Sequence, residues 1–338
     1  MNHALIKNLL LDAGKAIRQH LIHSLSAQSV HDLSLIREQK QEDTIFAIDR
    51  EVEPVLLQIF HEYQEAVGGI VLIAEGVGDE SGHVVLPQNI PIHQAQVRII
   101  VDPIDGTRGL MYNKRPAFFL AGAAPNKGQA TGLSDIEVAV MVELPVSKQY
   151  LADTLWAIKG KGVQGVRDNI LTGTSEQIFV APSKATSILG GFSQFARFFP
   201  PGREILSAIE EEFIRAVTPK SAEKALVFED QYISSGGQLY ELLMGHDRFV
   251  ADIRGLLYQK LRKEGKAGGH VCHPYDVCAH LIGCEAGLVI TDEYGNELNA
   301  PLNLTHEINW IGYANSQLCS HLKPELLSLL KKHQLIEP

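Results

Sequence analysis

The chain has 338 residues, about twice the length of an average domain, which predicts two domains or one large α/β unit. A composition of 45% hydrophobic and 21% charged residues is typical of a globular protein that buries a large core. No long basic run offsets the formal charge of −10, which argues against a nucleic-acid-binding surface. Lys7, Asp12 and Lys15 interrupt the apolar residues of the first segment, so we expect neither a signal peptide nor a membrane span.

The cysteines are few and lack the spacing of a zinc site or a disulfide framework. They are Cys272, Cys278, Cys284 and Cys319. This pattern favours buried free thiols in a reducing compartment, and hence a cytoplasmic protein.

The chain begins with two predicted helices. Apolar residues recur at steps of three and four over residues 6–21 and again over 52–63. Gly68-Gly69 is expected to end the second helical segment.

Two continuous apolar runs of strand length follow these helices, at residues 70–74 and 97–101. Each run stops at a carboxylate, Glu75 after the first and Asp102 after the second. Two buried strands that both end at an acid predict a functional site at their carboxyl ends.

The rest of the chain alternates strand and helix. Strand patterns cover residues 117–123, 136–144, 150–158 and 163–166, and later 248–253 and 288–291. Helices are expected over 203–213 and 238–244, from Pro274 onward, and over 325–332. We therefore predict a layered α/β sandwich in two halves, an N-terminal half over 1–175 and a C-terminal half over 176–338.

The most informative segment is 101–107, Val-Asp-Pro-Ile-Asp-Gly-Thr. A strand delivers Asp102, Pro103 forces a turn, and Asp105 follows three residues later, so two carboxylates and one carbonyl can aim at the same point. Thr107 can start a helix whose free N–H groups would bind an anion. Carboxylate and carbonyl oxygens are hard ligands that suit Mg²⁺. Alone, the segment could also be an ordinary Asp-Pro turn that caps a helix.

Three further carboxylates stand at the ends of predicted elements. Asp49 begins the second helix, Glu75 ends a strand, and Asp276 falls in the first turn after Pro274. Each alone fits a helix cap or a solvated strand end. Together with Asp102 and Asp105 they predict a shared acidic site, because the apolar structure beside them would not tolerate unpaired charges.

These residues resemble the inositol monophosphatase-like family of Mg²⁺-dependent, lithium-sensitive phosphatases. The resemblance runs in order over about residues 5–335. Its carrying residues are Asp49 with Val52-Glu53, Glu75, the Asp-Pro-Ile-Asp-Gly-Thr motif at 102–107, the hairpin at 154–165, Tyr275-Asp276 and Glu285-Ala286-Gly287.

The resemblance implies an αβαβα sandwich with two or three Mg²⁺ ions between its halves. Glu75, Asp102 and the Ile104 carbonyl would hold the first ion, and Asp102, Asp105 and Asp276 the second. Asp49 would help to hold a third and to orient water. Most of these ligands belong to the N-terminal half, and Asp276 belongs to the C-terminal half.

The resemblance also implies hydrolysis of a phosphate ester by a metal-activated water. Glu75 and the Thr107 hydroxyl would orient that water, while Asp105, Gly106, Thr107 and Arg108 would contact the substrate. Lithium would inhibit by taking a Mg²⁺ position, and a homodimer is common among members.

The sequence departs from the family pattern at three places. Glu75-Gly76 stands where members often have paired acids, so Asp79-Glu80 is an alternative ligand pair. Gly269 lies seven residues before Asp276, where inositol-cleaving members often carry an acid, which argues against an inositol phosphate as substrate. Arg108 and the basic segment 254–266 either recognise a second anionic group or lie at a solvated surface.

Three functions follow from this reading. The first is a Mg²⁺-dependent phosphomonoesterase that acts on a small polyol or sugar phosphate. The second is a bisphosphate phosphatase that acts on fructose 1,6-bisphosphate or a 3′(2′),5′-bisphosphate nucleotide. The third is a non-catalytic sensor of metal or phosphate. In each case the expected partner is a small phosphorylated metabolite, with no nucleic acid and no membrane.

Overall fold

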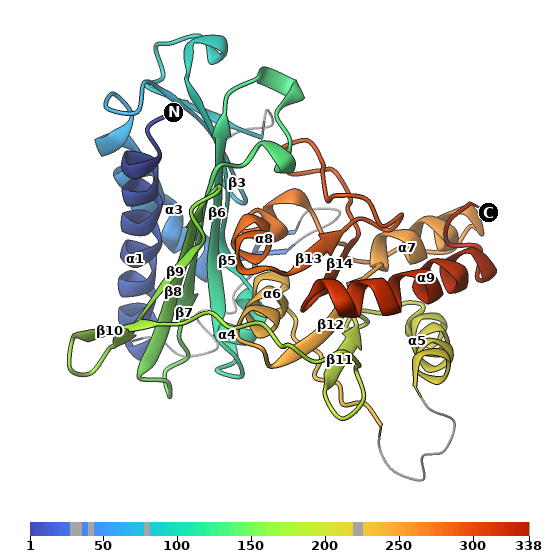
Figure 1. Cartoon of the computed structure of the whole chain (residues 1–338). Helices are drawn as coiled ribbons and strands as arrows, with labels where there is room; N and C mark the ends of the chain where they lie inside the picture. The colour runs from blue at the N-terminus through green and yellow to red at the C-terminus, as the bar shows by residue number, and fades with distance from the viewer. Residues whose placement is uncertain (28–35, 40–43, 78–81, 219–225, 338) are drawn as a thin grey trace.

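The structure is a computed structural model that describes residues 1–27, 36–39, 44–77, 82–218 and 226–337. Its elements stack in five layers, which Figure 1 shows nearly edge-on. Helices α1 (His3–Ala27) and α3 (Ala47–Tyr63) cover the outer face of a large sheet. Helices α6 (Ser235–Leu243) and α8 (His280–Ala286) lie between that sheet and a smaller one. The arrangement is the αβαβα sandwich that the sequence predicts.

The large sheet has eight strands in the order β10-β9-β8-β7-β6-β5-β3-β4. Strands β3 and β5 pair in parallel, and all other neighbours in this sheet are antiparallel. Their bounds are β3 Ile70–Ala74, β4 Val84–Leu86, β5 Val97–Asp105, β6 Ala117–Pro125, β7 Val138–Leu144, β8 Leu151–Ile158, β9 Val163–Asn169 and β10 Thr174–Ile178.

The central strands read as continuous apolar runs because both faces of the sheet are covered. Along β5, Ile99 and Val101 join the core beneath α1 and α3, whereas Ile100 joins the core on the opposite face. Helix α1 packs closely against the sheet at Gly14, where a Cβ atom would lie 2.6 Å from a Val142 methyl group.

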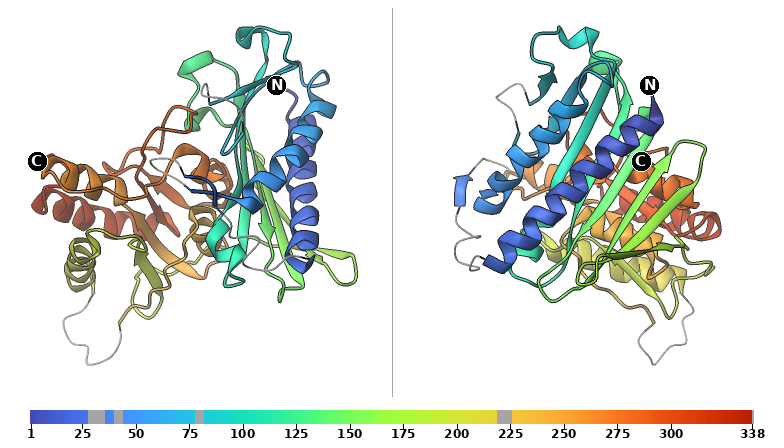
Figure 2. Two further views of the ribbon diagram at one scale, coloured as in Figure 1. Left: turned by 180° about the vertical axis from the view of Figure 1, so that it is seen from behind. Right: turned by 90° about the vertical axis from the view of Figure 1, so that its left-hand side faces the viewer.

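The smaller sheet has four strands in the order β11-β12-β14-β13, and three helices form the layer outside it. The left view of Figure 2, from behind, shows α1 and this outer layer at opposite ends of the molecule. The strands are β11 Phe192–Phe195, β12 Asp247–Asp252, β13 Val289–Thr291 and β14 Trp310–Tyr313, and the outer helices are α5 Arg203–Val217, α7 Arg254–Lys263 and α9 Ser316–Lys332.

The remaining elements are short. They are the helix α4 Thr107–Met111, the antiparallel pair β1 Ile36–Gln39 and β2 Thr44–Phe46, and the 3₁₀ turns η1 Ile92–Gln94, η2 Gly128–Ala130, η3 Leu133–Asp135 and η4 Pro274–Val277. Among the described helices, none combines the length and the apolar character that crossing a membrane requires.

Several expected elements differ from the observed ones. The helix expected from Pro274 is instead the 3₁₀ turn η4, followed by α8 as a separate helix. The basic segment after Arg254 forms the helix α7. Strands β10 and β14 and the first half of α9 were not predicted. The predicted division between residues 175 and 176 falls inside β10, and it stays a prediction.

The large sheet and the segment that follows Asp276 pack closely at Gly122 of β6. A Cβ atom there would lie 2.6 Å from both the Cys278 carbonyl oxygen and an Ile136 methyl group. The contact with backbone cannot be relieved by a change of rotamer, so any larger residue must displace the segment after η4.

We therefore expect Gly122→Ala to lower the free energy of unfolding by about 1–3 kcal/mol, the range for overpacked sites. Urea denaturation followed by circular dichroism measures this change. Gly268→Ala is the matched control, because the nearest atom to its Cβ is 3.4 Å away on the flexible Arg262 side chain. Equal stability of the Gly122 variant and the wild type would contradict this packing.

Candidate functional site

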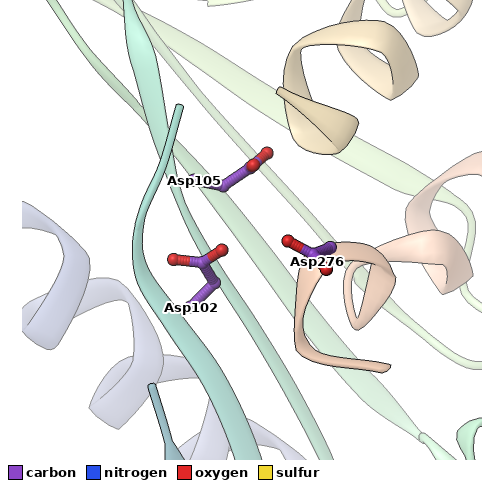
Figure 3. A group of neighbouring side chains, drawn as sticks. All are labelled: Asp102, Asp105 and Asp276. Atoms are coloured by element: carbon purple, nitrogen blue, oxygen red, sulfur yellow. The ribbon is translucent and has the colours of Figure 1, made fainter. Parts of the chain in front are cut away.

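Three carboxylates converge between the two sheets. Asp102 and Asp105 come from the end of β5 and Asp276 from η4, and one oxygen of each lies within 4.8 Å of the others (Figure 3). Asp102 is 1% exposed and Asp105 is 6% exposed, so these are buried groups rather than surface acids. The structure thus brings together the three acids expected to share the second ion.

A β-bulge explains how two acids three residues apart face the same way. Asp102 lies opposite Leu120 of β6 and Asp105 lies opposite Phe118, so Pro103 and Ile104 face the single residue between those two. Without the extra residue, Asp102 and Asp105 would point to opposite faces of the sheet. The Ile104 N–H donates to Asp102 Oδ1 over 3.0 Å, which holds the bulge and the first carboxylate together.

Asp276 is placed by the turn in which it lies and by the helix that follows. Its carboxylate accepts a hydrogen bond from the His273 N–H in a capping box, with Pro274 in the first turn. Farther along, Glu285 of α8 accepts from the N–H groups of Gly160 and Gly162, over 2.7 and 2.8 Å. Two of the family-like segments, the mid-chain hairpin and the Glu-Ala-Gly motif, therefore bind each other.

The N-terminus of α6 holds Asp105. Ser234 caps this helix by accepting from the Gly237 N–H, and its hydroxyl donates to Asp105 Oδ2 over 2.8 Å. The Gly236 N–H donates to the same oxygen, and a Cβ atom at Gly236 would lie 2.7 Å from it. Sequence reasoning missed this contact, although Ser-Ser-Gly-Gly before an apolar run is a recognisable helix start.

Burial raises the pKa of all three acids, and repulsion by neighbouring carboxylates raises it further for Asp102 and Asp276. Desolvation is the largest cause for Asp102, and the neighbouring Asp105 and Asp276 carboxylates add to it. The pKa of Asp276 is raised first by burial and then by the neighbouring Asp105 carboxylate. Burial raises the pKa of Asp105 to about 6, although the hydrogen bonds from Ser234 and Gly236 oppose this rise.

This donor set fits a divalent cation. Two buried carboxylates and the partly buried Asp276 carboxylate, so close together, cannot all ionise without a compensating positive charge. Carboxylate oxygens are the ligands that hard cations such as Mg²⁺ prefer. The site therefore has the charge and the chemistry to hold such an ion.

The other expected site residues line the cavity that these acids face. Thr107 Oγ1 lies 3.0 Å from Asp49 Oδ1 and 2.8 Å from the Ile104 carbonyl oxygen, and it can donate its proton to either. Also in the lining are Glu75, Gly106 and Arg108. Glu75 and Asp49 share the cavity but are not part of the three-acid group. The alternative pair Asp79-Glu80 lies outside the described residues.

Aromatic and cationic side chains also line this cavity. The buried Arg254 forms a bidentate pair with Asp252, at 2.8 and 2.6 Å, and donates to the His270 carbonyl oxygen over 2.9 Å. Its guanidinium carbon lies 4.4 Å from the ring centroid of Phe198 and 5.6 Å from that of Phe199. The Arg108 guanidinium carbon lies 5.7 Å from the Phe199 centroid.

Of the basic segment 254–266, Arg254 is the basic residue that lines the cavity. Lys260 and Lys266 instead pair with Glu264, and Arg262 pairs with Glu307. The prediction that the whole segment recognises a second anionic group is therefore wrong. The segment contributes one buried guanidinium group, that of Arg254, to the cavity. Sequence reasoning also missed Phe198 and Phe199, because the segment before α5 has no periodic pattern.

Comparison with known proteins agrees with this geometry. The sequence model of the inositol monophosphatase family matches residues 3–118, which include Asp49, Glu75 and the motif at 102–107. The search of curated proteins found no match. Solved structures match over nearly the whole chain at low identity, so they show likeness of fold.

One such structure is the native extragenic suppressor protein suhB from Bartonella henselae, which is 17% identical with a TM-score of 0.64 over 95% of this chain and 98% of that chain. The inositol monophosphatase from Anabaena is 15% identical, with a TM-score of 0.60 over 98% and 97%. The fructose-1,6-bisphosphatase of Leishmania major is 13% identical, with a TM-score of 0.66 over 96% and 92%.

The raised pKa of Asp105 predicts a stability that depends on both pH and metal. Because this pKa is about 6 in the folded chain instead of 3.8, the folded state keeps a proton that the unfolded chain releases. The contribution of this group to stability is therefore lost as pH rises from about 4 to above 6. Mg²⁺ should compensate the released charge and raise the melting temperature more at about pH 8 than at about pH 5.

Differential scanning fluorimetry in Mg²⁺ or in NaCl of equal ionic strength measures this difference. An equal rise in melting temperature at both pH values, or none, would show that the acids do not bind the cation in their ionised form.

Proposed function

Residues 3–118 match the inositol monophosphatase family and the whole chain has the fold of its solved structures, so we propose that the chain belongs to this superfamily and is a Mg²⁺-dependent phosphomonoesterase. Its substrate is a small polyol or sugar phosphate. The observation that carries this proposal is the convergence of the buried Asp102 and Asp105 with the partly buried Asp276 in one group that faces a cavity.

In this proposal the acids around the cavity would hold two or three Mg²⁺ ions. Glu75, Asp102 and the Ile104 carbonyl would hold one ion, and Asp102, Asp105 and Asp276 would hold a second. Asp49 would help to hold a third. When bound, the cations neutralise the acids, polarise the phosphoryl oxygens and lower the pKa of a bound water.

The side chains at the head of α4 and α6 position the reactants. Thr107 and Glu75 orient the attacking water, and the Thr107 hydroxyl is itself oriented by Asp49 or the Ile104 carbonyl. The N–H groups of Gly106 and Thr107 hold phosphate oxygens, and Ser234 and Ser235 line the same cavity. Direct attack by water needs no nucleophilic side chain, so no phosphoenzyme forms.

Asp102→Asn tests this assignment, because it removes the shared charge while keeping the size of the side chain. We expect kcat to fall by about 100-fold or more, since the loss affects charge stabilisation in the transition state. The metal-free variant should be at least as stable as the wild type, because one of three repelling groups is gone. Phosphate release with and without Mg²⁺, together with thermal melting, measures both effects.

Asp247→Asn is the matched control, because Asp247 is also buried and also has a raised pKa but does not line the cavity. It should keep wild-type turnover. Full activity of Asp102→Asn would contradict the proposed site. Metal binding by the wild type without release from any small phosphate would favour the non-catalytic sensor.

A second candidate function is cleavage of a bisphosphate. Arg108 and Arg254 both line the cavity, and both guanidinium groups pack near the ring of Phe199. Two guanidinium groups in one cavity suit a second anionic group on the substrate. Fructose 1,6-bisphosphate and a 3′(2′),5′-bisphosphate nucleotide carry such a group.

Matched substrate pairs decide between the two candidates. Fructose 1,6-bisphosphate and fructose 1-phosphate share the 1-ester, and adenosine 3′,5′-bisphosphate and 3′-AMP share the 3′-ester. If the second candidate is right, kcat/KM for a bisphosphate exceeds that of its partner by about tenfold or more, and Arg108→Met reduces this ratio. Lys114→Met is the control, because Lys114 is exposed and outside the cavity lining. Equal values within each pair would exclude the bisphosphate function.

The proposal extends to the setting in which the enzyme acts. The four cysteines are free in the structure, which suits a reducing cytoplasm. The net charge of −10 argues against a nucleic-acid partner. We also propose a homodimer and inhibition by lithium at a Mg²⁺ position, which sedimentation and phosphate-release assays would test.

A further inference from the structure

A row of side chains connects the three-acid group to a second polar cluster across the large sheet. Asp105 of β5 lies opposite Phe118 of β6, and Phe118 lies opposite Glu143 of β7. The Asp153 N–H of β8 donates to Glu143 Oε2 over 2.9 Å, and Asp153 lies opposite Arg167 of β9. Residues opposite each other on neighbouring strands share a face of the sheet, so the row lies on one face.

The far end of this row is an ion pair between the buried Asp153 and the partly exposed Arg167. Asp153 is 2% exposed, and Arg167 binds it through two hydrogen bonds, Nε to Oδ1 at 2.7 Å and Nη2 to Oδ2 at 2.8 Å. The Tyr240 hydroxyl donates to the same Oδ2 over 2.7 Å. Bidentate pairs of this kind fix the orientation of both partners, so Asp153 offers Tyr240 an acceptor with a defined position.

Tyr240 belongs to α6, the helix whose N-terminus holds Asp105. The contacts of Ser234 and Gly236 with Asp105 Oδ2 lie at one end of this helix, and the contact of Tyr240 with Asp153 lies one turn farther along. The Tyr240 ring packs 5.3 Å from the ring of Phe118, which is the strand neighbour of Asp105. Helix α6 is therefore tied to the same row of the sheet at two points.

The two ties depend on each other through the backbone of α6. From Gly236 to Tyr240 is about one helical turn, a rise of about 6 Å, over which a hydrogen-bonded helix moves as one body. Little room is left at the near end, because a Cβ atom at Gly236 would lie 2.7 Å from Asp105 Oδ2. A small shift of the helix therefore changes how its N–H groups meet that carboxylate.

We propose that Tyr240 is a positioning residue for Asp105, and that the Asp153–Arg167 pair is the fixed point against which it acts. Tyr240 and this pair line a different cavity from the one that the three acids face, so their effect on the site is transmitted by α6. The inference rests on the proposed divalent cation site, because its effect is on the affinity of that site.

Tyr240→Phe is the direct test, since it removes one hydroxyl and keeps the ring that packs on Phe118. Calorimetric titration of the full chain with Mn²⁺ alone should show binding about three- to tenfold weaker than in the wild type. Tyr313→Phe is the control, because Tyr313 is buried in the small sheet and lines neither cavity. Its Mn²⁺ affinity should equal that of the wild type.

Arg167→Lys is a second variant that affects the same contact between Tyr240 and Asp153, because it changes the partner that orients Asp153. It keeps the positive charge but loses the bidentate geometry, so its Mn²⁺ binding should weaken in the same direction. The double variant should bind no more weakly than the weaker single variant, since both changes loosen one contact.

Wild-type affinity in Tyr240→Phe would overturn the inference. Equal weakening in Tyr240→Phe and Tyr313→Phe would also overturn it, because a general loss of stability would then explain the result. A wild-type chain that binds no Mn²⁺ would overturn the proposed metal site itself. The wild-type titration therefore separates the failure of the proposed function from the failure of this inference.

Discussion

The repulsion among Asp102, Asp105 and Asp276 is the constraint on which the rest of the structure depends. Each burial of an ionised carboxylate costs several kcal/mol unless a partner compensates it, and here three such groups face one another. The fold offsets this cost only in part. Ser234 and Gly236 at the start of α6 donate hydrogen bonds to Asp105, and the His273 N–H donates one to Asp276. The remaining repulsion would be relieved by a divalent cation, which is the basis of the proposed metal site.

Because the acids come from different layers, their geometry depends on how the layers pack. The bulge at Pro103-Ile104 turns Asp102 and Asp105 to one face of the large sheet. The elements η4 and α6 pack against this same face. Close packing at Gly122 and Gly236 sets the distance between the layers. The core on both faces of β5 keeps this strand in place, so the two acids sit on a rigid element.

The sequence was most informative where a local pattern has one physical meaning. Continuous apolar runs predict strands covered on both faces, and residues 70–74 are such a strand in β3. The Asp102 to Thr107 motif predicts two carboxylates at one point, because Pro103 restricts the backbone between them and Gly106 allows the turn that follows. The family model matches residues 3–118, and solved structures of low identity share the αβαβα fold over nearly the whole chain, as the resemblance leads us to expect.

What the sequence could not predict are contacts between distant segments. Ser234 and Gly236 read as a helix start, but nothing local says that this helix meets Asp105. Arg254 reads as one of several basic residues, and only the fold shows it buried against Asp252, Phe198 and Phe199. Strand β14 was also missed, and its four residues include Gly312, a residue type that is depleted in strands. The division into halves and the roles of the site residues remain predictions.

The most direct test of the central claim is a crystal structure grown with Mn²⁺ and inorganic phosphate, with anomalous diffraction recorded at the manganese edge. The account predicts at least one strong anomalous peak among the carboxylates of Asp102, Asp105 and Asp276, with phosphate beside it near the head of α4. Three acids with no manganese between them, or manganese bound only elsewhere, would contradict it.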